Sequence, residues 1–297
     1  MSLASPVPWR RPHSKYAKNE VLFDMIESLE GIVSADGRPV VLELTGRIEC
    51  TAHLTGMPEL SVALNNPTLV QFPAWHPCVR HRPWTEQRQL NFVPPDGSFV
   101  LGHYTLAHRG GGSFLSQRSG ASYANQLPLT LRVHLGNYEA SREGFPFKIA
   151  IDPVLRAGLM LEHVTIEWYL GDGARGVDAS TSFQGSATYS RSRGFGSAPP
   201  DVGTAQPTTA GSVVFDRQRH VLRWTLPQMD AAAMGVLRGT LLAAPTCRPL
   251  YALQVQFLVT GHSLTGLKIS SIHLQQEHCV PTKGARTLLQ GALEWRR

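Results

Sequence analysis

The stretch from Arg38 to Leu54 reads RPVVLELTGRIECTAHL and alternates apolar with polar side chains over most of its length. A period of two residues is typical of a β-strand that has one buried face and one solvated face. The solvated face of such a strand is available to a partner. The apolar set is Leu42, Leu44, Ile48, Cys50, Ala52 and Leu54, and the polar set is Glu43, Thr45, Arg47, Glu49, Thr51 and His53.

The same alternation recurs in residues 163–170, 222–226 and 251–259. Turns rich in Gly and Pro, such as Pro94-Pro95-Asp96-Gly97, separate the strand-like segments. Many short strands joined by such turns predict an all-β sandwich or barrel. The length of 297 residues allows one large β unit or two subdomains, and a hydrophobic content of 42% is sufficient for a buried core.

Two segments depart from this pattern. In residues 20–31, the apolar positions fit a helical stripe at least as well as a strand, so the pattern alone favours a helix. Residues 171–212 contain no Leu, Ile or Met and are dense in Gly, Ser, Thr, Ala and Pro. Such a segment cannot bury enough apolar surface to order itself independently, which predicts a flexible insertion at about 171–212.

The net charge of +6 is densest in three short clusters. Positive charge favours anionic surfaces, and lipid headgroups are favoured over nucleic acid because no recognition helix or aromatic RNA-binding signature is present. A solvated surface without a specific partner is an equal alternative. The clusters are Trp9-Arg10-Arg11, Arg80-His81-Arg82 and Trp295-Arg296-Arg297.

The N-terminus lacks the apolar stretch of a signal peptide and no run of 18 apolar residues occurs, so we expect a cytoplasmic protein.

No constellation for catalysis or for a cofactor is evident. The Gly110-Gly111-Gly112 run lacks the Lys and the Ser or Thr of a P-loop, and neither G-x-S-x-G nor H-E-x-x-H occurs. His76, Cys78 and His81 match no zinc spacing, and the four widely separated cysteines are expected to be reduced, buried thiols. The sequence therefore predicts a binding protein without enzymatic activity, metal or cofactor.

Several segments resemble the mu homology domain of clathrin-adaptor medium subunits, and they occur in family order across nearly the whole chain. The branch of adaptor protein complex 3 is the most similar, through Asn66-Pro67, His76-Pro77-Cys78 and Arg82-Pro83-Trp84. The segments that resemble the family are Trp9-Arg10-Arg11, residues 15–20, residues 24–28, residues 54–60, residues 92–97 and residues 266–269.

The resemblance implies an elongated, immunoglobulin-like β-sandwich in two subdomains, the second inserted into the first. Subdomain A is expected at residues 8–126 and 260–297, and subdomain B at 127–259. It also implies a strand, not a helix, at residues 20–31. The implied role is cargo recognition within a heterotetrameric adaptor complex, peripheral on Golgi or endosomal vesicle membranes, for transport to the lysosome or vacuole.

The resemblance further implies that an extended Tyr-x-x-Φ sorting signal, where Φ is bulky and apolar, pairs with an edge strand at Lys283–Arg286. Asp24 is expected to accept a hydrogen bond from the phenol, and Arg286 to stack on the ring or donate to it. The tyrosine pocket is expected to comprise Leu22, Asp24, Thr51, Gly284 and Arg286. The apolar pocket is expected to comprise Val21, Phe23, Ile269, Ile272 and Ala285.

Three positions depart from the family pattern. Leu22 stands where an aromatic residue is usual, Thr51 where a Lys can occur, and Gly284 where a Trp can occur. Each lost ring contact weakens tyrosine binding by about 0.5–1.5 kcal/mol. The alternative hypothesis is therefore a structural and membrane-docking module of the coat, with a degenerate signal pocket.

Overall fold

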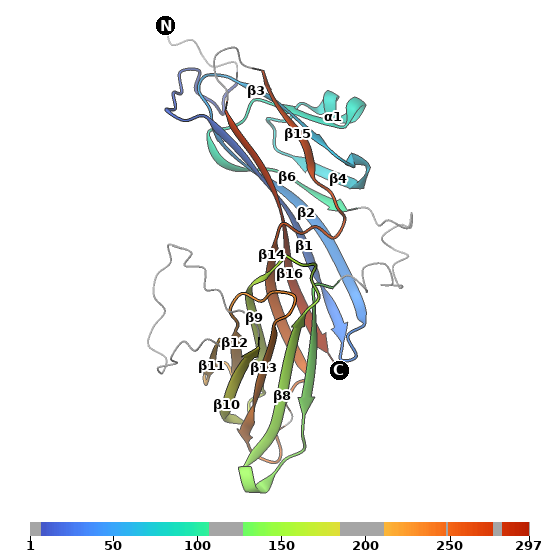
Figure 1. Cartoon of the computed structure of the whole chain (residues 1–297), viewed down its shortest axis with the longest axis vertical. Helices are drawn as coiled ribbons and strands as arrows, with labels where there is room; N and C mark the ends of the chain where they lie inside the picture. Colours follow the sequence, from blue (N-terminus) through green and yellow to red (C-terminus); the bar gives the residue numbers. More distant parts are fainter. Residues whose placement is uncertain (1–6, 107–126, 185–210, 248, 276–280, 297) are drawn as a thin grey trace. The chain divides into compact units, whose positions relative to one another are not determined.

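Nearly all regular structure in this protein is β-strand, as the computed structural model in Figure 1 shows. The main exception is one short helix, α1 (His81–Gln87). No helix among the described residues is long and apolar enough to cross a membrane. The all-β prediction is confirmed. The structure describes residues 7–106, 127–184, 211–247, 249–275 and 281–296.

The chain divides into two compact units, each made of separate segments. Three strands of 15 residues each, β1 (Glu20–Ser34), β2 (Pro39–His53) and β16 (Thr282–Arg296), contribute residues to both units. The division therefore falls within these strands, and the subdomain boundaries expected from the sequence stay a prediction. The first unit is Met1–Ser28, Leu44–Ser116 and Gly261–Leu289; the second is Leu29–Glu43, Gln117–Thr260 and Gln290–Arg297.

Two sheets build the first unit. Their facing surfaces are apolar, and the rings of Phe23 on β1 and Phe92 on β5 pack edge to face with centroids 6.5 Å apart. Both side chains are fully buried, so this contact lies in the core between the sheets. One sheet has the order β16-β1-β2-β6 (Gly97–Leu106)-β4 (Val70–Trp75), and the other has the order β15 (Ile269–Gln275)-β3 (Glu59–Leu64)-β5 (Gln89–Phe92).

The second unit repeats this two-sheet arrangement. Phe147 on β8 and Trp168 on β9 pack edge to face at 5.3 Å and join the sheets through a buried core. One run of strands is β11 (Ser212–Asp216)-β12 (Val221–Thr225)-β9 (Leu161–Tyr169)-β14 (Ala252–Thr260)-β16, which belongs to the same nine-stranded sheet as β16-β1-β2-β6-β4. The other runs β10 (Ala174–Gln184)-β13 (Met234–Ala243)-β8 (Gly144–Pro153)-β7 (Leu129–Leu135).

The alternating stretch between Arg38 and Leu54 forms β2. From Leu44 onward every second side chain is buried, whereas Leu42 is only half-buried. Residues 20–31 form β1, so the helix favoured by pattern alone is wrong and the strand implied by the family is confirmed. Pattern misled there because Ile26 and Glu27 are both buried, which interrupts the two-residue period.

The predicted insertion at 171–212 is partly wrong. Its first part contains β10, which pairs with β13 at the edge of its sheet, with nine consecutive register positions from Gly176 to Gln184 and one more pair at Ala174 across a register shift. An edge strand can form from Ser, Thr and Gly because the neighbouring strand supplies its hydrogen bonds and only one face needs burial. Residues 185–210 of the predicted insertion lie outside the described part of the chain.

The basic clusters found in the sequence are largely neutralised by nearby carboxylates. Arg10 is only 2% exposed, and its guanidinium lies among backbone carbonyls and one carboxylate rather than at the surface. Trp295 is also buried. Among the described residues of these clusters, Arg11 is exposed and the other four arginines each face a carboxylate, so they present less unopposed charge than the sequence suggested. The described ion pairs are Arg10–Asp96, Arg80–Glu59, Arg82–Glu86 and Arg296–Glu294.

Cys50, Cys78 and Cys247 are buried free thiols, and Cys279 lies outside the described residues. Burial raises the pKa of the Cys78 thiol to about 12. Burial also raises the pKa of the Cys50 thiol, and the electrostatic effect of the neighbouring Cys78 raises it further. Because the thiolate is the reactive form, we expect neither thiol to be alkylated by iodoacetamide at pH 8 in the folded protein. Mass spectrometry after unfolding should find both labelled; labelling of either before unfolding would contradict the burial.

Candidate functional site

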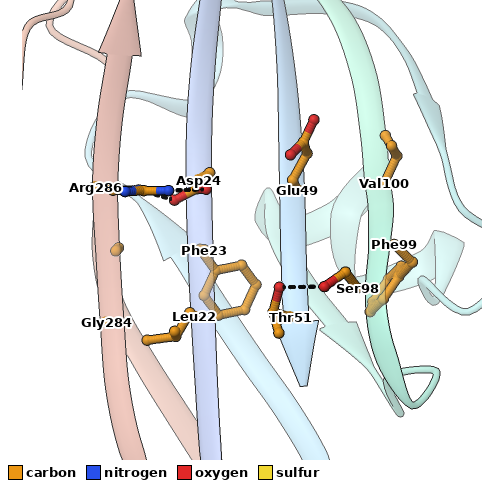
Figure 2. Close-up of a pocket in the computed structure, with 11 residues that line it drawn as sticks. Leu22, Phe23, Asp24, Glu49, Thr51, Ser98, Phe99, Val100, Gly284 and Arg286 are labelled. Atoms are coloured by element: carbon orange, nitrogen blue, oxygen red, sulfur yellow. Dashed lines mark hydrogen bonds and ion pairs between the residues drawn. The ribbon is translucent and has the colours of Figure 1, made fainter. Parts of the chain in front are cut away.

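A pocket of about 750 Å³ opens on the first unit, on the solvated face of four adjacent strands. The strands are β16, β1, β2 and β6, and their side chains form two rows of four across the sheet (Figure 2). One row is Gly284, Leu22, Thr51 and Ser98. The other row is Arg286, Asp24, Glu49 and Val100.

The register of these strands explains why residues far apart in sequence meet. Antiparallel pairing places Thr51 opposite Ser98 and Glu49 opposite Val100. The contact of His53 with Glu20 places the next same-face residues of β1, Leu22 and then Asp24, beside Thr51 and Glu49. All these positions share the parity that the alternation of β2 identifies as solvated. The pocket is thus the wet face of the sheet.

Arg286 and Asp24 form a bidentate ion pair at one side of the pocket. The distances are 2.5 Å from Nε to Oδ1 and 2.8 Å from Nη2 to Oδ2. The Asp24 side chain is 26% exposed and that of Arg286 is 63% exposed, so the pair contributes little to stability. Its fork geometry does fix both groups in place. A ligand hydroxyl therefore meets a carboxylate acceptor and guanidinium donors that are already oriented.

The floor beside this pair is aliphatic. Leu22 is 42% exposed, and its Cδ2 atom would lie only 2.9 Å from a Cβ atom at Gly284. The absence of a side chain at Gly284 thus leaves room for Leu22 to lean toward β16. Together they offer a small apolar surface on which an aromatic ring can rest.

The far side of the pocket combines polar groups with the exposed apolar side chain of Val100. The hydroxyl oxygens of Thr51 and Ser98 lie 2.8 Å apart, and either can be the donor. The Glu49 carboxylate lies 2.8 Å from Nε of Arg47. Prediction from the sequence missed Glu49, Ser98, Phe99 and Val100, which also line this pocket. The shared parity of Glu49 and Thr51 was a usable signal, whereas the β6 residues required the strand register.

Comparison with family models matches residues 7–296 to the adaptor complexes medium subunit family. The chain belongs to this family. Human AP-3 complex subunit mu-2 is 28% identical over 285 residues, and AP-3 complex subunit mu-1 of Gallus gallus is 26% identical over the same length. Each match covers 95% of this chain but 58% of the relative, so the chain spans little more than half of those proteins.

Solved structures agree on the fold of this medium-subunit domain. The yeast delta-COP-I mu-homology domain matches with a TM-score of 0.60 at 17% identity, covering 94% of this chain and 98% of that one. The Danio rerio Fcho1 mu homology domain matches with a TM-score of 0.52 at 11% identity, covering 95% and 98%. That Fcho1 domain was solved with a bound Eps15 peptide. The mu homology resemblance is confirmed.

The medium-subunit domain brings all five predicted tyrosine-pocket residues to one pocket, but it does not do so for the predicted apolar pocket. Val21 and Phe23 are 0% and 1% exposed and belong to the core on the opposite face of β1. Ile269 and Ile272 lie half-buried on β15, and of the five residues only Ala285 and Phe23 are among those that line the 750 Å³ pocket. The core parity of β1 explains this separation.

The predicted edge strand is the beginning of β16. The neighbouring strand β14 ends at Thr260, and the next residue, Gly261, donates its backbone N–H to the carbonyl of Thr287 at 2.7 Å. Lys283–Arg286 therefore lie beyond the end of β14. On the β15 side, Nζ of Lys283 donates to the carbonyl of Ile272 at 3.1 Å. Within the described ranges, no group of three His, Cys, Asp or Glu side chains is placed to hold a metal ion.

Proposed function

We propose that this medium-subunit domain recognises Tyr-x-x-Φ sorting signals in the cytosolic tails of membrane proteins. It would do so as part of a heterotetrameric adaptor complex on Golgi or endosomal vesicles, for transport to the lysosome or vacuole. The observation that carries the proposal is the oriented Asp24–Arg286 pair on β1 and β16, at the part of β16 that extends past the end of β14. The destination rests on the similarity to AP-3 mu subunits.

The binding mode follows from the geometry of β16. An extended peptide adds alongside Lys283–Arg286, where main-chain hydrogen bonds supply affinity without reading sequence. The tyrosine ring then lies over Leu22, and its hydroxyl donates to Asp24 while accepting from Arg286. A phosphate on the tyrosine would meet Asp24 and Glu49, so phosphotyrosine should be rejected by like-charge repulsion.

The apolar residue of the signal would be read at the β15 side of β16. Ile269, Ile272 and Ala285 retain exposed surface there, whereas Val21 and Phe23 support the site from within the core. Burial of one Φ side chain contributes about 1.5–3 kcal/mol. The signal is thus held by one polar and one apolar anchor on either side of its backbone.

The decisive experiment titrates a labelled Tyr-x-x-Φ peptide into the wild-type protein and the Asp24→Ala variant. Loss of a hydrogen bond to a charged group should weaken binding by about 1.5–3 kcal/mol, or roughly 10- to 150-fold. The matched control is Glu59→Ala, because Glu59 is 27% exposed and pairs with the 58% exposed Arg80, away from the pocket. A peptide with Tyr→Ala should bind no better to wild type than to Asp24→Ala.

Equal affinity of the Tyr and Ala peptides, or wild-type affinity in Asp24→Ala, would refute this function. The second candidate, a structural and membrane-docking module with a degenerate pocket, is favoured by the absence of a ring contact at Gly284 and Thr51. Flotation with anionic vesicles separates the two hypotheses. Strong vesicle binding combined with no peptide binding would establish the second candidate in place of the first.

A further inference from the structure

The part of β16 that extends past the end of β14 limits how an added peptide can be placed. It starts at Thr282, the first residue of the strand. It ends at Thr287, whose carbonyl accepts the backbone N–H of Gly261 at 2.7 Å. Lys283 to Arg286 are the four residues in between, and a Tyr-x-x-Φ signal also spans four residues. The signal therefore has little freedom to slide along this edge.

The position of the tyrosine then selects one of the two possible strand directions. The ligand hydroxyl must reach the Asp24–Arg286 pair, which lies on the pocket face of the sheet (Figure 2). Residues directly opposite each other in an antiparallel pair share a face, so the tyrosine lies opposite Arg286. An antiparallel peptide then places Φ opposite Lys283. A parallel peptide would carry Φ to Thr287 or beyond, where the edge is already occupied.

Lys283 is a cation at the position where the Φ residue of the signal would lie. It is exposed, and its ammonium donates to the carbonyl of Ile272 at 3.1 Å. That carbonyl is neutral, and it uses one of the three donors of the ammonium. Among the described residues Lys283 forms no ion pair, whereas Lys18 pairs with Glu20 at 3.1 Å. The charge of Lys283 is therefore free to meet an anion of the ligand.

We propose that Lys283 binds the α-carboxylate of a signal whose Φ residue ends the cargo tail, an assignment that rests on the proposed function. The substrate class is thus a Tyr-x-x-Φ sequence at the extreme C-terminus. Opposite residues of an antiparallel pair have Cα atoms about 4.5–5.5 Å apart, and the flexible stem of lysine carries its ammonium over such a distance. The stem lies along the Φ side chain while the ammonium meets the carboxylate.

A signal inside a longer tail would gain less from Lys283. The carboxylate would be replaced by a neutral amide, and the next residue would lie opposite Thr282, where β16 begins. An amide carbonyl still accepts a hydrogen bond, but a bond in which both partners are charged is stronger than one to a neutral acceptor. The edge of β16 thus distinguishes the end of a peptide chain from its interior.

The test titrates three peptides with the same Tyr-x-x-Φ sequence into the protein. The first ends in the free carboxylate of Φ, the second ends in the carboxamide of Φ, and the third continues with Gly-Gly before its carboxylate. The first and third peptides carry equal net charge, which controls for general attraction to a chain of net charge +6. The wild type should bind the first peptide about fivefold more tightly than the others, the upper range for an exposed ion pair.

Variants of Lys283 assign this preference to one side chain. Lys283→Gln should bring the three affinities close together, because the Gln side chain carries no charge. Lys283→Arg keeps the charge and should keep a preference for the free carboxylate. Lys268→Gln is the matched control, because Lys268 is also exposed, lies just before β15 in the same unit and loses the same charge. It should keep the wild-type preference.

Equal affinity of the wild type for the three peptides, with binding still lost on Tyr→Ala, would overturn the role of Lys283 and leave the proposed function intact. A preference for the free carboxylate that persists in Lys283→Gln, or that Lys268→Gln abolishes equally, would also overturn it. Failure of all three peptides to bind in a Tyr-dependent way would refute the proposed function and this role together. The peptide comparison needs only wild-type protein, so it stays decisive if a variant fails to fold.

Discussion

Replacing Glu27 with Ala is expected to lower the free energy of unfolding by about 3–5 kcal/mol. Glu27 lies on β1 and is only 4% exposed. Its carboxylate accepts hydrogen bonds from the Ser263 hydroxyl at 2.7 Å, from the Leu264 amide at 2.6 Å, and from the amide and hydroxyl of Thr265. Removing the carboxylate leaves several buried donors without an acceptor, and each such donor costs about 1–3 kcal/mol when water cannot reach it.

The same carboxylate ties the segment 263–265 to β1, and that segment leads into β15, where Ile269 and Ile272 lie. Loss of Glu27 should therefore loosen the start of β15 as well as lower global stability. Urea unfolding measures the first effect, and hydrogen exchange at the Leu264 and Thr265 amides measures the second. Exposed Glu30, on the same strand, is the control, and Glu30→Ala should change stability by less than about 0.5 kcal/mol.

A Glu27→Ala loss below 1 kcal/mol, with unchanged exchange at the Leu264 amide, would show that the network does not support this segment. Glu27→Gln refines the result. The Gln side chain keeps the volume and one acceptor oxygen. Its NH2 group, however, replaces the second carboxylate oxygen and points toward groups that are themselves hydrogen-bond donors. We therefore expect Glu27→Gln to be destabilising, though less so than Glu27→Ala.

Replacing Arg10 with Met is expected to cost a similar 3–5 kcal/mol. The Arg10 side chain is fully buried, and it bonds the carbonyls of Gly56 at 2.7 Å and Pro94 at 3.1 Å, that of Leu54, and Asp96 at 2.9 Å. It thus joins the residues after β2 to the turn before β6. Met fills similar space but leaves buried carbonyls and one carboxylate without this partner.

Chemical unfolding of Arg10→Met and Arg11→Met tests this assignment, because Arg11 is the exposed neighbour with the same chemistry. Arg11→Met should be close to neutral. Arg10→Lys should also be strongly destabilising. The planar guanidinium of Arg can bond carbonyls on two segments at once, whereas the compact ammonium of Lys cannot. Equal stabilities of Arg10→Met and Arg11→Met would contradict a structural role for Arg10, because a buried and an exposed arginine should differ.

The strands were predictable where one face is dry and the other is wet. From Leu44 to Leu54 the alternation in sequence matches alternate burial, because successive side chains of a strand point to opposite faces. In β1 the same rule failed, since Glu27 is a polar residue buried by tertiary hydrogen bonds and Leu22 is an apolar residue exposed in a pocket. The positions that broke the period are thus Glu27, held by tertiary hydrogen bonds, Leu22, which lines the pocket, and the buried Ile26.

The candidate site was predictable only in part. Family resemblance pointed to Leu22, Asp24, Thr51, Gly284 and Arg286, and the structure places them around one pocket. Their role in tyrosine binding stays a prediction. The β6 side of the pocket was not predictable, because it depends on which residue of one strand pairs with which residue of the next, and that register is a long-range property.

By itself, the amino-acid sequence determined the β class of this protein and, through its motifs, its membership of the medium-subunit family. Both are encoded locally, in periodicity and in short runs of residues. Only the tertiary structure decided which charged side chains are buried and which charged side chains lie next to one another. It buries Arg10, from a cluster that appeared exposed, and aligns Lys148 with Arg238 across two strands. The physical reason is that charge compensation depends on spatial neighbours, and strand pairing selects these from distant parts of the chain.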